Sequence, residues 1–222
     1  MKHSLHVAIV ALFFLLVGCG NDIKEKAKTN LPWHSVVTKE GYTQFLGVDV
    51  GKSTFKEMMF KLKLLAEPAL FENATDGKLT LEAYFGKKKF GILEARLIVE
   101  MDADEALLKK MLEEKVGDRE STPSNYWKYQ LTVKNTKIAN DLRIWRLIYL
   151  PTTNYEMKQM KFFGKPEEKV KVNETAEYWF YPSKGMVLLY DTAGKEIFYY
   201  VAQKDFARLK ASLPKKAMMI IR

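Results

Sequence analysis

The second half of the chain alternates between apolar segments and polar segments rich in Gly, Pro, Asp and Ser. Runs of aromatic and β-branched residues there predict strands. The sequences Pro182-Ser-Lys-Gly185 and Asp191-Thr-Ala-Gly194 predict hairpin turns between them. The expected strands cover residues 126–134, 142–150, 176–181, 186–190 and 196–201, and the expected helices cover 154–163 and 204–212.

The first half carries a similar series of segments. Runs of strand with one or two short helices packed on one face indicate an α+β fold with an antiparallel sheet. The expected strands cover 36–37, 42–50, 79–85 and 92–100, and the expected helices cover 53–65 and 103–115.

The two halves share an order of parts that indicates a tandem duplication, at offsets of about one hundred residues. Thr54-Phe-Lys-Glu57 and Thr153-Asn-Tyr-Glu156 both have the form of a capping box, which satisfies the open N–H groups of a helix start. Asp104 and Asp205 each predict the N-cap of a later helix. Two further matches align residues 45–50 with 144–149 and 64–68 with 162–166. We therefore expect two tandem modules, over 32–115 and 125–214, with a linker at 116–124 and a tail at 215–222.

The start of the chain has the pattern of an export signal. Lys2 precedes an apolar run of twelve residues, Val7 to Gly18, which is shorter than the roughly 20 residues that a spanning helix needs. The run ends in Leu16-Val17-Gly18-Cys19, which resembles the lipobox of bacterial lipoproteins. An ordinary cleaved signal with an incidental Cys, or an uncleaved anchor, are the alternatives.

The lipobox resemblance implies cleavage between Gly18 and Cys19 and a covalent diacylglycerol and N-acyl lipid on Cys19. Residues 1–18 are then the signal peptide, and 19–31 form a lysine-rich tether to the membrane. Gly20 in place of Asp favours the outer membrane, facing the periplasm, if the host is Gram-negative.

Charge and composition narrow the classes of partner to be expected. The chain has a formal net charge of +9 and 47% hydrophobic residues, which is typical of a folded, basic body. An exported protein meets anionic lipid headgroups, wall polymer or acidic proteins rather than nucleic acid. Scattered lysines that only confer solubility are the simpler interpretation. Lys24, Lys26 and Lys28 differ, because the tether holds them close to the bilayer.

Several motifs that suggest chemistry have structural explanations. Gly47 and Gly51-Lys52-Ser53 stand where a P-loop would, but three residues separate the glycines instead of four, so we expect no nucleotide. The acidic run from Glu100 to Glu105 lacks the Gly and the distal Glu of a calcium loop, and we assign no metal site.

Histidine and cysteine are too scarce for most catalytic sets. After removal of the signal peptide only His34 remains, and the chain has one Cys, so no Cys/His pair or disulfide is expected. We assign no catalytic residue and no cofactor beyond the lipid. A hydrolase that uses Ser with Lys, or two carboxylates, stays open, although Ser121, Ser124 and Ser183 stand in turn-like surroundings.

Aromatic residues are the remaining conspicuous class. In Tyr178-Trp179-Phe180-Tyr181, successive side chains must face opposite sides of the sheet. Core packing explains them, but an exposed aromatic patch would mark a partner site. The candidate partner surface comprises Trp127, Trp145, Tyr178, Trp179 and Tyr181.

The segment from Phe162 to Val201 resembles the SmpA/OmlA (BamE-like) group of small outer-membrane lipoproteins. The resemblance is carried by the helix end Phe162-Phe163-Gly164-Lys165-Pro166, the strand Trp179-Phe180-Tyr181 and the hairpin around Gly194-Lys195. The module in tandem resembles β-lactamase inhibitory proteins. The first copy departs from the pattern, with Ala66-Glu67-Pro68. The resemblance implies a non-enzymatic binding module.

Together these features predict a lipid-anchored protein of the bacterial cell envelope that acts as a non-enzymatic binding or scaffold module for another envelope component, with an envelope protein as the expected partner. The alternative is an envelope hydrolase acting on wall polymer or lipid. A polar pocket converging on Ser, Lys or carboxylates would favour the hydrolase, whereas flat aromatic surfaces would favour the binding protein.

Overall fold

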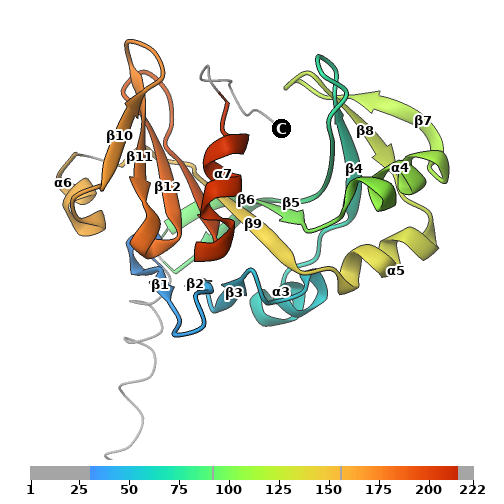
Figure 1. Cartoon of the computed structure of the whole chain (residues 1–222), viewed down its shortest axis with the longest axis horizontal. Coiled ribbons are helices and arrows are strands. Elements are labelled where there is room, and N and C mark those ends of the chain that lie inside the picture. Colours follow the sequence, from blue (N-terminus) through green and yellow to red (C-terminus); the bar gives the residue numbers. More distant parts are fainter. Residues whose placement is uncertain (1–30, 92, 156, 215–222) are drawn as a thin grey trace, which may run out of the picture.

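A computed structural model describes residues 31–91, 93–155 and 157–214. It confirms the predicted α+β class with antiparallel sheets (Figure 1). The larger sheet runs in the order β10 (Glu168–Lys171), β11 (Ala176–Tyr181), β12 (Met186–Asp191), β13 (Ile197–Val201), β9 (Ile144–Pro151), β6 (Leu93–Met101), β5 (Leu79–Phe90), β4 (Pro68–Asn73), β8 (Tyr126–Gln130) and β7 (Val116–Ser121).

A small sheet and short helices complete the fold. The small sheet contains β1 (Val36–Val37), β2 (Thr43–Phe45) and β3 (Val48–Val50). The α-helices are α3 (Phe55–Leu62), α4 (Glu105–Glu113), α5 (Val133–Asp141), α6 (Met157–Met160) and α7 (Phe206–Ser212). Short 3₁₀ helices are η2 (Pro32–His34), η3 (Lys161–Phe163), η4 (Pro182–Lys184) and η5 (Gln203–Asp205).

The central strands of the large sheet are buried on both faces, and their alternating side chains enter two separate clusters. Tyr178 and Phe180 of β11 belong to the cluster that includes Leu209 of α7. Trp179 and Tyr181 belong to the larger cluster, which contains side chains of α3, α4 and the small sheet. Burial of both faces explains why the strands of this half are almost continuously apolar.

The two expected modules share the large sheet. β6 pairs with β9, so hydrogen bonding continues from the first half into the second. β8 lies in the second module by sequence but pairs with β4 of the first. The expected linker at 116–124 is corrected by the structure, because Val116–Ser121 forms the edge strand β7. All six residues of β7 are exposed, which explains their polar, loop-like composition.

The repeat is reproduced in some of its parts. β6 and β13 are the two neighbours of β9, and each is followed by the helix that Asp104 or Asp205 precedes. Residues 45–50 and 144–149, which the repeat aligns, lie in different sheets.

The helix starts show where the repeat fails locally. Thr54 forms the predicted capping box with Glu57. The matching helix α6 begins at Met157, too late for Thr153 to cap it, and Glu156 lies outside the described residues.

Two further predictions are corrected. The pattern predicts one strand over 42–50, but the structure has a β2–β3 hairpin, because Leu46 and Gly47 both adopt positive φ, as a type I′ turn requires. The pattern also predicts one strand over 126–134, but β8 ends at Gln130 and α5 begins at Val133. Thr132 causes this change, because its hydroxyl accepts a hydrogen bond from the Asn135 N–H at 3.1 Å and caps the helix.

Candidate functional site

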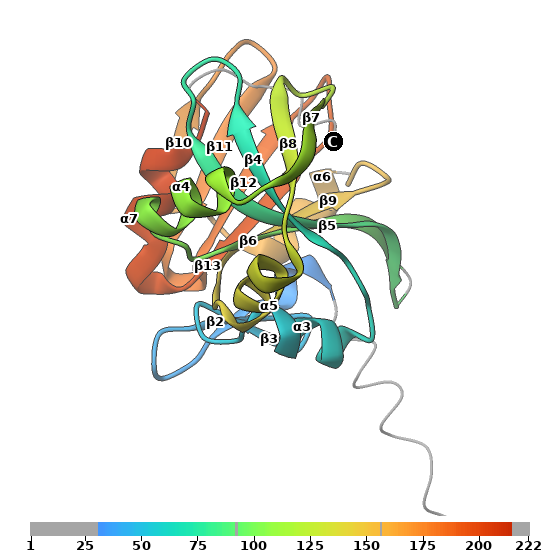
Figure 2. The ribbon, with the colours of Figure 1, turned by 90° about the vertical axis from the view of Figure 1, so that its right-hand side faces the viewer.

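The structure places a groove of about 650 Å³ between α4 and α7. β6 and β13 both run antiparallel to β9, so they point the same way, and the helices that follow them start at the same end of the sheet. Figure 2 shows both helices on one side of the molecule. The rest of the lining comes from the turn at 76–78, from β5 and from the ends of β6 and β9.

Core packing fixes the two helices and leaves other faces free for the groove. The Asp104 carboxylate caps α4 by accepting a hydrogen bond from the Leu107 N–H at 2.8 Å. Leu108 and Met111 then anchor α4 in the core, and Leu209 anchors α7.

The side chains left on the groove walls are of mixed character. Glu105 and Lys109 of α4 form an exposed ion pair at 2.6 Å, and Arg208 and Ala211 of α7 stand on the opposite wall. Leu79, Leu81 and Met101 add apolar surface, so the groove combines both charges with apolar contacts.

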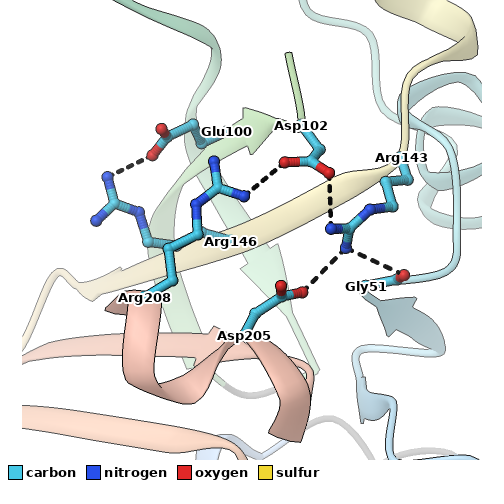
Figure 3. Close-up of polar contacts among 7 residues, drawn as sticks. All are labelled: Gly51, Glu100, Asp102, Arg143, Arg146, Asp205 and Arg208. Carbon is cyan, nitrogen blue, oxygen red and sulfur yellow. Dashed lines mark hydrogen bonds and ion pairs between the residues drawn. The ribbon is translucent and has the colours of Figure 1, made fainter. Parts of the chain in front are cut away.

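A network of ion pairs joins the ends of four elements beside the groove (Figure 3). Asp102 lies between two guanidinium groups, at 2.6 Å from Arg143 and 2.5 Å from Arg208. Arg143 also pairs with Asp205 at 3.0 Å and donates to the Gly51 carbonyl at 3.3 Å. The network therefore ties the ends of β6 and β3 to the starts of β9 and α7.

The network keeps Asp102 ionised. Burial raises the pKa of the Asp102 carboxyl, but the hydrogen bond from Arg208 and the charge of Arg143 outweigh burial and lower that pKa below its ordinary value. Asp205 stands at the N-cap of α7 as predicted, but its side chain caps no N–H group and pairs with Arg143 instead.

A second ion pair forms the floor. Glu100 and Arg146 are cross-strand partners on β6 and β9, and their side chains pair while only 8% and 14% exposed. Arg146 also donates to the Ser212 hydroxyl at 3.2 Å, and that hydroxyl donates to the Leu209 carbonyl at 2.8 Å. Because Ser212 donates to a carbonyl and accepts from a cation, its geometry is that of a structural hydroxyl and not of an activated nucleophile.

Trp145 is the aromatic residue of the predicted surface that reaches the groove. It stands at an irregularity in the β6–β9 pairing, between Met101↔Ile144 and Glu100↔Arg146. The Arg208 guanidinium lies 3.8 Å from the ring centroid and the Arg146 guanidinium 4.9 Å from it. Such cation–π contacts hold the arginines against the ring and leave Trp145 only 2% exposed.

The structure contradicts the prediction of an exposed aromatic patch. Trp145, Tyr178, Trp179 and Tyr181 are each at most 6% exposed, because both faces of the sheet are covered. Trp127 is half-buried, with the Arg119 guanidinium 4.0 Å from its ring. The core-packing interpretation is therefore the correct one for the four buried residues.

Gly51, which suggested a P-loop, has a packing role. It has φ +93°, and a Cβ there would lie 2.5 Å from the Ala202 Cβ. Only glycine permits this close contact between the β3–α3 turn and the residue after β13.

The acidic run that suggested a metal is also accounted for. Asp102 pairs with arginines, Asp104 caps α4 and Glu105 pairs with Lys109. Within the described ranges, three or more His, Cys, Asp or Glu side chains nowhere gather in a way that would hold a metal ion.

The anchor prediction falls outside the described part of the chain. Gly18, Cys19 and Gly20 precede Leu31, the first described residue. From Leu31 onward, no described helix has the length and apolar character needed to cross a bilayer.

Comparison of the chain with protein-family models, curated proteins and solved structures gives no significant match. The resemblance to the SmpA/OmlA group and to β-lactamase inhibitory proteins therefore stays a prediction.

Sequence reasoning missed the arginines that organise the groove. Arg143 and Arg146 interrupt the otherwise apolar segment Leu142–Leu150. Charged residues are rarely buried unless they are paired, so two arginines in a buried strand predict carboxylate partners. The sequence gives no means of identifying those partners, which are 41 to 62 residues away for Arg143 and 46 for Arg146.

Proposed function

We propose that this chain is a lipid-anchored protein of the bacterial cell envelope that binds a segment of another envelope protein in the groove between α4 and α7. Leu16-Val17-Gly18-Cys19 at the end of a short apolar run supports the anchor. Gly20 supports location on the outer membrane, facing the periplasm, in a Gram-negative host.

The composition of the groove carries the binding proposal. The Arg208 guanidinium lies over the Trp145 ring, and acidic and basic side chains stand on the walls around them. The Arg208 side chain is 44% exposed, and arginine is enriched among the residues that dominate protein–protein binding energies. Charges of both signs beside Leu79 and Met101 suit a polypeptide segment better than a small anion or a lipid chain.

Preorganisation also supports binding. The ion pairs of Asp102, Arg143 and Arg146 fix the floor and one wall before any partner arrives, which reduces the entropy lost on binding. A partner then meets a surface whose charges are already oriented.

Photo-crosslinking in cells tests the groove. A photoreactive amino acid is placed at Ala211 or Lys109, which stand on opposite walls, and at Glu120 or Lys171, on the outer strands β7 and β10, as matched exposed controls. We expect both wall positions to form a discrete product with the same envelope protein and the control positions to form none. Absence of a wall product above background, or the same product from the controls, would refute groove binding.

Metabolic labelling tests the anchor separately. Cys19→Ala is expected to abolish incorporation of labelled palmitate and to release the protein from membranes. Continued labelling of Cys19→Ala would refute acylation at this residue, whatever the crosslinking shows.

A further inference from the structure

Several exposed apolar side chains of the described structure lie on elements at or near the start of the described chain. Phe60 and Leu65, at the end of α3 and just after it, are 86% and 87% exposed, the two highest values among the large apolar residues of the described structure. Val36 of β1 and Phe162 of η3 are 60% and 59% exposed. Exposed apolar residues that cluster commonly mark an interaction site.

A groove lies between the start of the described chain and the end of α3, next to Phe60 and Leu65 in the sequence. It has a volume of about 560 Å³ and is lined by His34 and Val36 next to Lys61, Leu62 and Leu64. Phe162 reaches the same segment, because its ring stacks on Trp33 at 5.0 Å between centroids. Figures 1 and 2 show β1, the small sheet and α3 together at the lower end of the molecule.

Lysines surround the apolar side chains. Lys56 and Phe60 are one helical turn apart on the exposed side of α3, Lys63 is the residue that ends the helix, and Lys61 stands at the groove. These three lysines are exposed and pair with no described carboxylate, and Glu57, the acid of this helix, is engaged in the capping box. Lys161 and Lys165 flank Phe162 and are also exposed.

We propose that this surface, defined by Val36, Phe60, Leu65 and Phe162 with Lys56, Lys61, Lys63, Lys161 and Lys165, docks on an anionic phospholipid bilayer. The apolar side chains would enter the headgroup region and the lysines would contact lipid phosphates. This combination of apolar and basic residues is the one that peripheral membrane surfaces use.

The length of the tether supports a bilayer as the occupant, and this step rests on the proposed lipid anchor. The segment between Cys19 and Leu31 cannot span more than about 40 Å even when fully extended, so a lipid on Cys19 keeps this end of the body near the membrane. Tethering raises the effective concentration of bilayer at the surface, so weak docking is enough.

Docking in this orientation leaves the binding groove accessible. The groove between α4 and α7 shares no lining residue with the groove at His34 and Val36. The body would therefore be held with a fixed face on the membrane and its partner groove outside that face.

Vesicle binding of a chain that cannot be acylated tests the proposal. The processed chain from residue 19, carrying Cys19→Ala, is sedimented with vesicles of phosphatidylethanolamine and phosphatidylglycerol, and with vesicles of phosphatidylcholine alone. We expect at least about tenfold tighter binding to the anionic vesicles, weakened by salt, since each lysine near such a surface contributes roughly fivefold.

Matched variants locate the contact. Phe60→Ser with Leu65→Ser is expected to weaken binding at least about tenfold, and Lys56→Glu with Lys63→Glu to weaken it further still. Val170→Ser and Lys171→Glu on the exposed strand β10 are the controls and should bind like the parent chain. Circular dichroism should show unchanged folding, because Phe60 and Leu65 are largely exposed.

Three results would overturn the proposal. The first is that the parent chain does not bind anionic vesicles, and the second is that the α3 variants bind as tightly as the controls do. The third is that the Phe60/Leu65 variant converts a dimer in solution to a monomer while vesicle binding persists, which would make the surface a contact between copies. None of these results depends on acylation at Cys19 or on crosslinking at Ala211, so failure of the docking proposal is distinguishable from failure of the proposed function.

Discussion

Replacement of Arg143 by Met is the sharpest test of the ion-pair network. The substitution keeps an unbranched apolar stem but removes the pairs with Asp102 and Asp205 and the hydrogen bond to the Gly51 carbonyl. Asp102 keeps Arg208 as a partner, whereas Asp205, whose side chain is 12% exposed, loses its ion pair. The cost therefore comes mainly from a nearly buried carboxylate without a counter-charge.

The size of the expected loss in unfolding free energy follows from how deeply Arg143 is buried. Removing one partner of a fully buried pair costs about 3–5 kcal/mol, and an exposed pair contributes at most about 1 kcal/mol. The Arg143 side chain is 28% exposed, so solvent screening places the expected loss between these limits, at about 2–3 kcal/mol. For a chain of this size, that loss corresponds to a fall in Tm of about 5–10 °C.

Urea unfolding followed by circular dichroism measures the loss, with Lys109→Met as control. Lys109 pairs with Glu105 while the two side chains are 64% and 80% exposed, so its removal should change the free energy of unfolding by less than about 0.5 kcal/mol. Adding Asp205→Asn to Arg143→Met should recover part of the lost stability, because a neutral amide needs no counter-charge. An Arg143→Met protein within about 0.5 kcal/mol of the parent, or strictly additive single changes, would refute the reasoning.

Three further predictions follow from burial and backbone geometry. Because the pKa of Asp102 is lowered on folding, ionised Asp102 stabilises the fold fully above its unfolded-state pKa of about 3.9, and this stabilisation is lost as the pH falls through the folded-state pKa. Asp102→Asn should therefore make the free energy of unfolding less dependent on pH in the acid range. Burial raises the pKa of Glu196, only partly opposed by hydrogen bonds from the backbone N–H groups of Glu196 and Tyr155. The ionised form therefore destabilises the fold above that raised pKa, and Glu196→Gln should raise Tm at pH 7 but not below about pH 4; an equal gain at both pH values would contradict this. Gly185→Ala should lower the free energy of unfolding in urea by more than about 3 kcal/mol, since φ is +57° and the new Cβ would lie 2.0 Å from the Thr43 Oγ1. Gly117→Ala, at φ +68° with open space around it, should lower it by about 1 kcal/mol. Equal losses for the two variants would contradict the packing argument.

Local signals in the sequence determined most elements of the second half. Residues 176–181 form a strand with the predicted limits, because a segment with five apolar or aromatic residues out of six between turn signals has few other ways to be buried. The capping residues of α3 and α4 were also predictable from the sequence, since Thr54 and Asp104 each accept a hydrogen bond from a backbone N–H only three residues later. The α+β class follows from these local elements and their order.

Strands whose conformation comes from pairing, and not from an apolar pattern of their own, were not predicted from the sequence. β7 exposes every residue and carries no apolar pattern, so its strand conformation comes from pairing with β8 at the sheet edge. β4 and β10 were missed as well. Their strand conformation depends on partners such as β8 and β11.

The sequence by itself determined the local elements, the basic charge and the lipobox-like start of the chain. The tertiary structure decided which faces of those elements are covered. Aromatic residues that suggested a partner surface lie in the core, and the groove is instead formed by α4, α7 and an arginine network. The physical reason is the separation along the sequence of the residues that interact. Capping and periodicity act within a few residues, whereas the partners of Arg143 and Arg146 come from the end of β6 and from the start of α7.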